Sequence, residues 1–158
     1  MTRRQIPLDA SELLGTLTAH EVAFVVVGGV AVQAHGHPRT TQDLDIVPEP
    51  SPENLERLQE ALHALGARRA AGRRPLQLRL PSTGVVELDT DAGGIDVHLN
   101  PPGAAPYRQL RARALEIQLD SLVPIAGLDD LIAMKRASGR PIDRGDILAL
   151  TEPSVFET

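Results

Sequence analysis

The sequence contains no cysteine and no tryptophan, and its 158 residues include only two phenylalanines and one tyrosine. Without cysteine, neither a disulfide framework nor a thiolate zinc site can form. So few aromatic side chains leave almost nothing on which a run of nucleic-acid bases can stack. The formal net charge of −5 also argues against a surface that coats nucleic acid. These absences exclude proteins stabilised by disulfides and zinc proteins with cysteine ligands, and they argue against proteins that coat nucleic acid along its length.

Long apolar runs are also missing. No stretch approaches the roughly 20 residues that a membrane-spanning helix needs, and the charged residues 1–5 are not followed by the apolar segment of a signal peptide. We therefore expect a cytoplasmic protein that makes no membrane contact. The length and the 42% hydrophobic content predict one domain over residues 1–158 with an aliphatic core. Within it we expect a core of about residues 8–100 and a C-terminal helical part of about residues 104–158.

The most informative stretch begins with the apolar run 22–27, which is rich in β-branched residues and predicts a buried strand. The run ends at Gly28-Gly29, and residues 30–34 predict a short helix. Glycine has no Cβ, so the backbone can turn tightly and a ligand can approach it closely. The free N–H groups of a helix start attract an anionic group. Gly28 and Gly29 are therefore candidate phosphate-binding residues, although a glycine pair after a strand is often only a turn.

Asp43 and Asp45 lie in the next predicted strand, residues 43–47. Residues two apart in a strand point to the same face, so we expect both carboxylates to project together while Leu44 and Ile46 enter the core. The two carboxylates repel each other by about 1 kcal/mol in water and roughly 4 at an effective dielectric of 20. A divalent cation such as Mg²⁺ removes this repulsion and prefers carboxylate and phosphate oxygens. The alternative is a solvated strand end without a ligand.

Two common phosphate-binding motifs are absent from the sequence. No segment reads G-x-x-x-x-G-K-[ST], and the glycine pair lacks the G-x-G-x-x-G spacing of a dinucleotide fold. The glycine pair followed by Asp-x-Asp therefore requires another explanation.

This order and spacing resemble the signature of the DNA polymerase β-like nucleotidyltransferase superfamily. The surrounding residues, with Arg39 and Thr40 before the aspartates, are similar to small bacterial nucleotidyltransferases related to AbiEii-type toxins. The resemblance implies an α+β nucleotidyltransferase fold, with a mixed central sheet flanked by helices. It also implies that the glycine turn positions a nucleoside triphosphate and that Asp43 and Asp45 hold Mg²⁺. Arg39 and Thr40 are then candidate nucleotide-binding residues.

A third carboxylate is expected on a predicted hairpin of strands 85–89 and 95–99, joined through residues 91–94. In the second strand Ile95 and Val97 alternate with Asp96, so Asp96 faces away from them. The family pattern has a lone aspartate in the middle of this strand, which favours Asp96 as a metal ligand and catalytic base. Asp89 and Asp91 are rivals, although an aspartate in a turn needs no catalytic explanation. His98 is expected to share the face of Asp96.

The C-terminal region contains a predicted helix around residues 127–136 and a further helix from about 141 to 150. The AbiEii-type resemblance covers these residues and implies that Lys135 lies near the triphosphate. The alternative for Lys135 is an exposed helix lysine. Arg140, Asp143 and Asp146 are expected to form ion pairs that join the two helices.

The leading hypothesis is therefore a magnesium-dependent nucleotidyltransferase that transfers a nucleoside monophosphate from a triphosphate to an acceptor hydroxyl. Asp43, Asp45 and Asp96 are its expected catalytic residues. The acceptor remains open between a small molecule, RNA and protein, and the four arginines at 68, 69, 73 and 74 fit either an acceptor surface or a solvated loop. The alternatives are a non-catalytic or toxin component of a toxin–antitoxin pair, with a cognate antitoxin as partner, and an antibiotic-type small-molecule nucleotidyltransferase.

Overall fold

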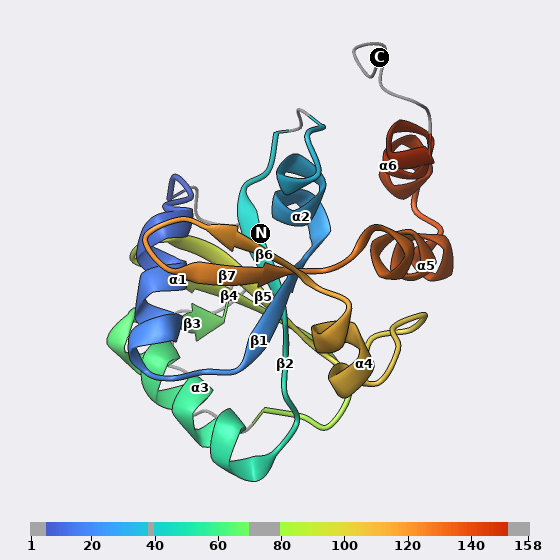
Figure 1. Ribbon diagram of the computed structural model, residues 1–158. Helices are drawn as coiled ribbons and strands as arrows, with labels where there is room; N and C mark the ends of the chain where they lie inside the picture. Colours follow the sequence, from blue (N-terminus) through green and yellow to red (C-terminus); the bar gives the residue numbers. More distant parts are fainter. Residues whose placement is uncertain (1–5, 38–39, 70–79, 152–158) are drawn as a thin grey trace.

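The computed structural model describes residues 6–37, 40–69 and 80–151, which form a seven-stranded mixed sheet with helices around it (Figure 1). The expected α+β class is therefore confirmed. The strands are β1 Phe24–Val27, β2 Asp43–Pro48, β3 Arg68–Arg69, β4 Gly84–Thr90, β5 Gly93–Leu99, β6 Leu115–Gln118 and β7 Leu122–Ile125. The helices are α1 Ala10–Ala19, α2 Gly28–Ala34, α3 Pro52–Ala64, α4 Tyr107–Ala112, α5 Leu128–Ser138 and α6 Pro141–Thr151. The strand order across the sheet is β3-β4-β5-β2-β1-β7-β6.

Local capping signals define the starts of α1 and α3. Asp9 Oδ1 accepts a hydrogen bond from the backbone N–H of Glu12 at 3.0 Å, which satisfies one of the free donors at the start of α1. Ser51 caps α3 in the same way, and Pro52 takes the first helical position. The two helices pack side by side and place their leucine stripes in the core.

A buried asparagine fixes α3 against the ends of β1 and β2. The side chain of Asn54 is fully buried; its Nδ2 donates to the carbonyls of Ala23 and Glu49, and its Oδ1 accepts from the Ala23 N–H at 2.7 Å. These hydrogen bonds offset the free-energy cost of burying the amide, and they hold the neighbouring segments in one register. The central strands are thereby anchored at the end opposite to the glycine turn.

The register of the central strands places the predicted carboxylates. β2 is antiparallel to β1 and parallel to β5, with Asp45 directly opposite Asp96. β4 is antiparallel to β5 and sets Glu87 opposite Asp96. Three neighbouring strands therefore each contribute a carboxylate to one row across the sheet.

The turn between β4 and β5 differs from the predicted four-residue connection. The strands continue to Thr90 and start again at Gly93, so that only Asp91 and Ala92 connect them. The buried hydroxyl of Thr90 donates to the Gly93 carbonyl at 2.7 Å and accepts from the Ala92 N–H at 3.0 Å. Gly93 has a φ of +108°, which favours glycine. Together these features tighten the turn.

Other segments also depart from the predictions or fall beyond them. Arg68 and Arg69, expected in a loop, pair with β4 as the edge strand β3. The arginines at 73 and 74 lie outside the described residues. The C-terminal part adds strands to the sheet as well as helices, because β7 pairs in parallel with β1 and β6 pairs with β7. Within the described ranges, no helix is long and apolar enough to cross a membrane.

Candidate active site

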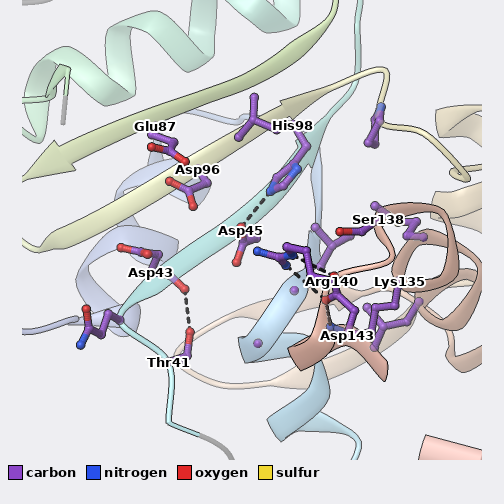
Figure 2. A pocket seen from close by; sticks show the side chains of 18 of the residues that line it. Thr41, Asp43, Asp45, Glu87, Asp96, His98, Lys135, Ser138, Arg140 and Asp143 are labelled. Carbon is purple, nitrogen blue, oxygen red and sulfur yellow. Dashed lines mark hydrogen bonds and ion pairs between the residues drawn. The ribbon is translucent and has the colours of Figure 1, made fainter. Parts of the chain in front are cut away.

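A cleft of about 580 Å³ lies where the start of α2 and the strands β2, β4 and β5 face α5 and α6 (Figure 2). Seven predicted site residues line it: Gly28, Gly29, Thr40, Asp43, Asp45, Asp96 and Lys135. Arg39, the remaining one, lies outside the described residues. The structure therefore brings together residues that are more than 100 positions apart in the sequence.

Gly28 lies directly against the Asp45 side chain. It has a φ of +67° and begins α2 directly after β1. A Cβ atom placed on Gly28 would lie 2.3 Å from Asp45 Oδ2, a separation that only a shift of one of the groups can relieve. Gly29 follows in the same first turn, whose N–H groups have no acceptor within the helix. Glycine at position 28 therefore meets both a backbone and a steric requirement.

Asp43 and Asp45 share one face of β2, as the alternation predicts. Both are partly exposed in the cleft, whereas Leu44 and Ile46 are fully buried on the other face. His98 Nε2 lies 2.8 Å from Asp45 Oδ1. An ionised carboxylate can only accept a hydrogen bond, so the His98 ring donates here and restricts the orientation of Asp45. The sequence predicted only that His98 shares the face of Asp96. In the structure its ring contacts Asp45 on the neighbouring strand β2.

The carboxylates fit a magnesium ion by their donor chemistry and by their strand register. Asp45 and Asp96 stand opposite each other on adjacent strands, which are about 4.8 Å apart. In their present rotamers, no three carboxylate or histidine groups among the described residues are gathered tightly enough to hold a metal ion. Because the side chains already share one face, changes of rotamer can bring their oxygens onto a common cation.

Glu87 is a cleft residue that the sequence reasoning missed. It lies opposite Asp96 on β4 and is exposed in the cleft. The available signal was the alternation of the first hairpin strand, combined with a two-residue turn in place of four. Asp89, a rival for the third carboxylate, is only 5% exposed and is not part of the cleft lining. Asp91, the other rival, lies in the turn, 3.4 Å from Arg68.

Lys135 is buried in an ionic cluster that joins α5 to α6, which we call the α5–α6 cluster: Lys135, Arg140, Asp143 and Asp146. Its Nζ donates to Asp146 Oδ2 at 2.7 Å and to Asp143 Oδ1 at 3.4 Å, and the side chain is 5% exposed. Arg140 donates twice to Asp143, at 2.8 and 3.2 Å. The expected ion pairs between the helices are present, and Lys135 belongs to them instead of being an exposed helix lysine.

The cluster also faces the aspartates of β2. The hydrogen bond with Asp143 raises the pKa of Arg140, and the negative charge of Asp45 adds to that effect. Figure 2 shows the Arg140 side chain between Asp45 and Asp143. A charged guanidinium therefore lies within the electrostatic reach of the carboxylate row.

The Asp143 carboxyl gives the α5–α6 cluster a defined pH dependence. Burial raises its pKa, but hydrogen bonds from Arg140 and Ser138 and the charges of Arg140 and Lys135 outweigh this and lower the pKa to about 2. The folded-state pKa lies below the unfolded value of 3.8, so the stabilisation is present above about pH 4 and is lost as the pH falls towards 2. We expect the stability advantage of the wild type over Asp143→Asn to shrink by about 1 kcal/mol between pH 6 and pH 2.5, after allowance for solvent screening at the exposed Arg140. Urea unfolding of both proteins at the two pH values measures this, and an advantage independent of pH would contradict it.

Solved structures with similar folds support this architecture. The lincosamide antibiotic adenylyltransferase LnuA, bound to lincomycin, superposes with a TM-score of 0.66 at 17% identity, covering 94% of this chain and 100% of LnuA. The resistance factor ANT(2'')-Ia in complex with adenylyl-2''-tobramycin gives a TM-score of 0.57 at 14% identity, covering 88% of this chain and 83% of that chain. TM1012 from Thermotoga maritima gives a TM-score of 0.60 at 14% identity, covering 87% of this chain and 86% of TM1012. At these identities the likeness establishes the nucleotidyltransferase fold.

The family is established by the sequence itself. No curated protein sequence matches the chain. The model of the family described as "Nucleotidyl transferase AbiEii toxin, Type IV TA system" matches residues 13–138, which is most of the chain. This range includes the glycine turn, the cleft carboxylates Asp43, Asp45, Glu87 and Asp96, and Lys135. The chain belongs to the AbiEii nucleotidyltransferase toxin family.

Proposed function

We propose that this protein is a magnesium-dependent nucleotidyltransferase that transfers a nucleoside monophosphate from a nucleoside triphosphate to an acceptor hydroxyl. The observation that carries the proposal is the register of Asp45 opposite Asp96, with Asp43 on the same face and Gly28 against Asp45. Family membership and the similar folds support nucleotidyl transfer as the reaction class.

In the proposed reaction, the acceptor oxygen forms a bond to the α-phosphorus. The bond from the α-phosphorus to the oxygen that bridges it to the β-phosphate breaks, and pyrophosphate leaves. Asp43 and Asp45 would hold Mg²⁺, and the 2.8 Å contact with His98 would help to orient Asp45. When bound, magnesium would neutralise the charge that develops on the phosphate oxygens. Asp96 accepts the proton of the acceptor hydroxyl.

The remaining predicted residues bind the triphosphate in this scheme. The first turn of α2 at Gly28 and Gly29 offers N–H groups to phosphate oxygens. Thr40 lines the same cleft. Lys135 and Arg39 are proposed as counter-charges for the triphosphate. Lys135 acts within the α5–α6 cluster, where its charge is shared with two carboxylates.

Metal-dependent binding of a triphosphate is the first test of this function. We expect isothermal titration calorimetry to detect at least one of the four nucleoside triphosphates in the presence of Mg²⁺. Its affinity should fall by at least about tenfold in EDTA, because the carboxylates on β2, β4 and β5 then face the phosphates without a cation. If none of the four triphosphates binds with magnesium present, the proposed function is wrong.

A role as the toxin component of a toxin–antitoxin pair is the second candidate, and the family description favours it. Such a protein would use the same transfer chemistry and would be neutralised by a cognate antitoxin. The acceptor distinguishes a toxin from an antibiotic-type nucleotidyltransferase. A toxin would modify a macromolecule of the cell, whereas an antibiotic-type enzyme would modify a small molecule.

A further inference from the structure

We propose that Glu87 binds a protonated amine of the acceptor, so that the cleft selects small molecules carrying both an amine and a hydroxyl. This inference rests on the proposed function, because it assigns the acceptor side of the same cleft. Glu87 is proposed as a specificity-determining residue; it takes no part in bond formation.

The first argument is the position of Glu87 beside the proposed base. β4 and β5 set it directly opposite Asp96, and Figure 2 shows the two carboxylates next to each other on their strands. The acceptor hydroxyl must reach Asp96 to lose its proton. Adjacent strands are about 4.8 Å apart, so a group of the same acceptor a few bonds from the hydroxyl meets Glu87.

The second argument is that the carboxylate of Glu87 has no hydrogen-bonding partner among the described residues. It is exposed in the cleft and forms no hydrogen bond or ion pair with any described residue. Asp45, by contrast, contacts His98, and Asp143 contacts Arg140 and Lys135. Glu87 therefore keeps its full capacity to accept hydrogen bonds from a ligand.

The third argument is the distribution of charge in the cleft. Its described cations, Lys135 and Arg140, belong to the α5–α6 cluster and lie across the cleft from β4. The β4 side presents a carboxylate, with Val85 51% exposed two residues earlier on the same face. Phosphates of an RNA acceptor would be repelled here, as the net charge of −5 also disfavours RNA. An ammonium on a partly apolar molecule finds both a charge partner and a contact surface.

The test compares one acceptor with and without its positive charges. The probes are tobramycin, which carries several amines and hydroxyls, its fully N-acetylated form, and a short RNA with a free 3′ hydroxyl. Transfer is followed at pH 7.5 with Mg²⁺ and the triphosphate that binds best, by pyrophosphate release and product mass. Acceptor binding is measured by calorimetry with a non-hydrolysable triphosphate present.

We expect the wild type to bind and modify the amine form at least about tenfold better than the acetylated form. Glu87→Gln should lower kcat/KM for the amine form by about tenfold or more, mainly through KM, and leave the acetylated form nearly unchanged. Triphosphate affinity should stay within about twofold of the wild type. Glu60→Gln, which removes an equal charge from the exposed face of α3, is the matched control and should behave as the wild type.

Three results would overturn the inference. Equal use of both tobramycin forms, or binding of neither, excludes selection by charge. Transfer to RNA in preference to the amine excludes the acceptor class while leaving the proposed function intact. Loss of triphosphate binding in Glu87→Gln would place Glu87 among the nucleotide–metal ligands. Failure of the wild type to bind any triphosphate is a separate result, and it overturns the proposed function itself.

Discussion

Asp96→Asn is expected to lower the rate of nucleotidyl transfer by at least about a hundredfold, the smallest effect usual for removal of a general base, while a triphosphate still binds. An amide cannot accept the proton of the acceptor hydroxyl, and it is a poorer ligand for a second metal ion. In the proposed scheme Asp43 and Asp45 would still hold magnesium in this variant, so the triphosphate affinity should fall by less than about tenfold. Single-turnover kinetics and calorimetry on the same preparation separate the two effects.

The rival carboxylates provide the controls for this experiment. Asp91→Asn should do little, since Asp91 lies in the turn and its exposed carboxylate pairs with Arg68, away from the cleft. Asp89→Asn should leave transfer largely intact, since Asp89 is buried and not part of the cleft lining. Full activity in Asp96→Asn together with loss in Asp89→Asn would show that the proton acceptor is on β4.

Gly28→Ala is expected to lower transfer by about a hundredfold or more, because a new methyl group would stand 2.3 Å from Asp45 Oδ2. Relief of this clash moves either the turn or the carboxylate, and misplacement by about 1 Å can cost about a hundredfold in rate. The left-handed backbone adds strain of about 1–2 kcal/mol, which should appear as reduced stability. Transfer rates and urea unfolding are the two measurements.

Gly139→Ala is the control that separates backbone strain from the contact with Asp45. Gly139 has a φ of +64°, close to the +67° of Gly28, but a Cβ atom there would meet nothing within 4 Å. It should lose similar stability and keep most of its activity. If the two alanine variants are equally active, the contact between the turn and Asp45 is not needed for transfer.

The strand–turn–strand segment was predictable from the sequence because its signals are local. The β-branched run before Gly28 and the alternation around Asp43 and Asp45 each depend on residues a few positions apart. The face of Asp96 followed from the same alternation. Each of these features is determined by which side of one strand is buried.

The features that escaped prediction depend on contacts between distant segments or on turn length. A four-residue turn would pair Asp89 with Asp96. The hydroxyl of Thr90 instead closes a two-residue turn, and the resulting register pairs Glu87 with Asp96. The burial of Lys135 depends on how α5 packs on α6, which no local pattern encodes. The strand order, with β1 between β2 and β7, likewise results from long-range pairing.

The way α6 is attached has a consequence for local unfolding. Among the described elements α6 packs mainly on α5, and its buried residues are Asp143, Asp146 and a single leucine, Leu150. Ile147 adds a partly buried contact with the core. A helix held by two carboxylates and two apolar side chains opens at a lower free energy than a sheet with a continuous core. Its amides should therefore exchange with solvent deuterium well before those of β1 and β2. Each such opening would carry Arg140 away from the aspartates, so the enzyme can lose one wall of its cleft while the sheet stays folded.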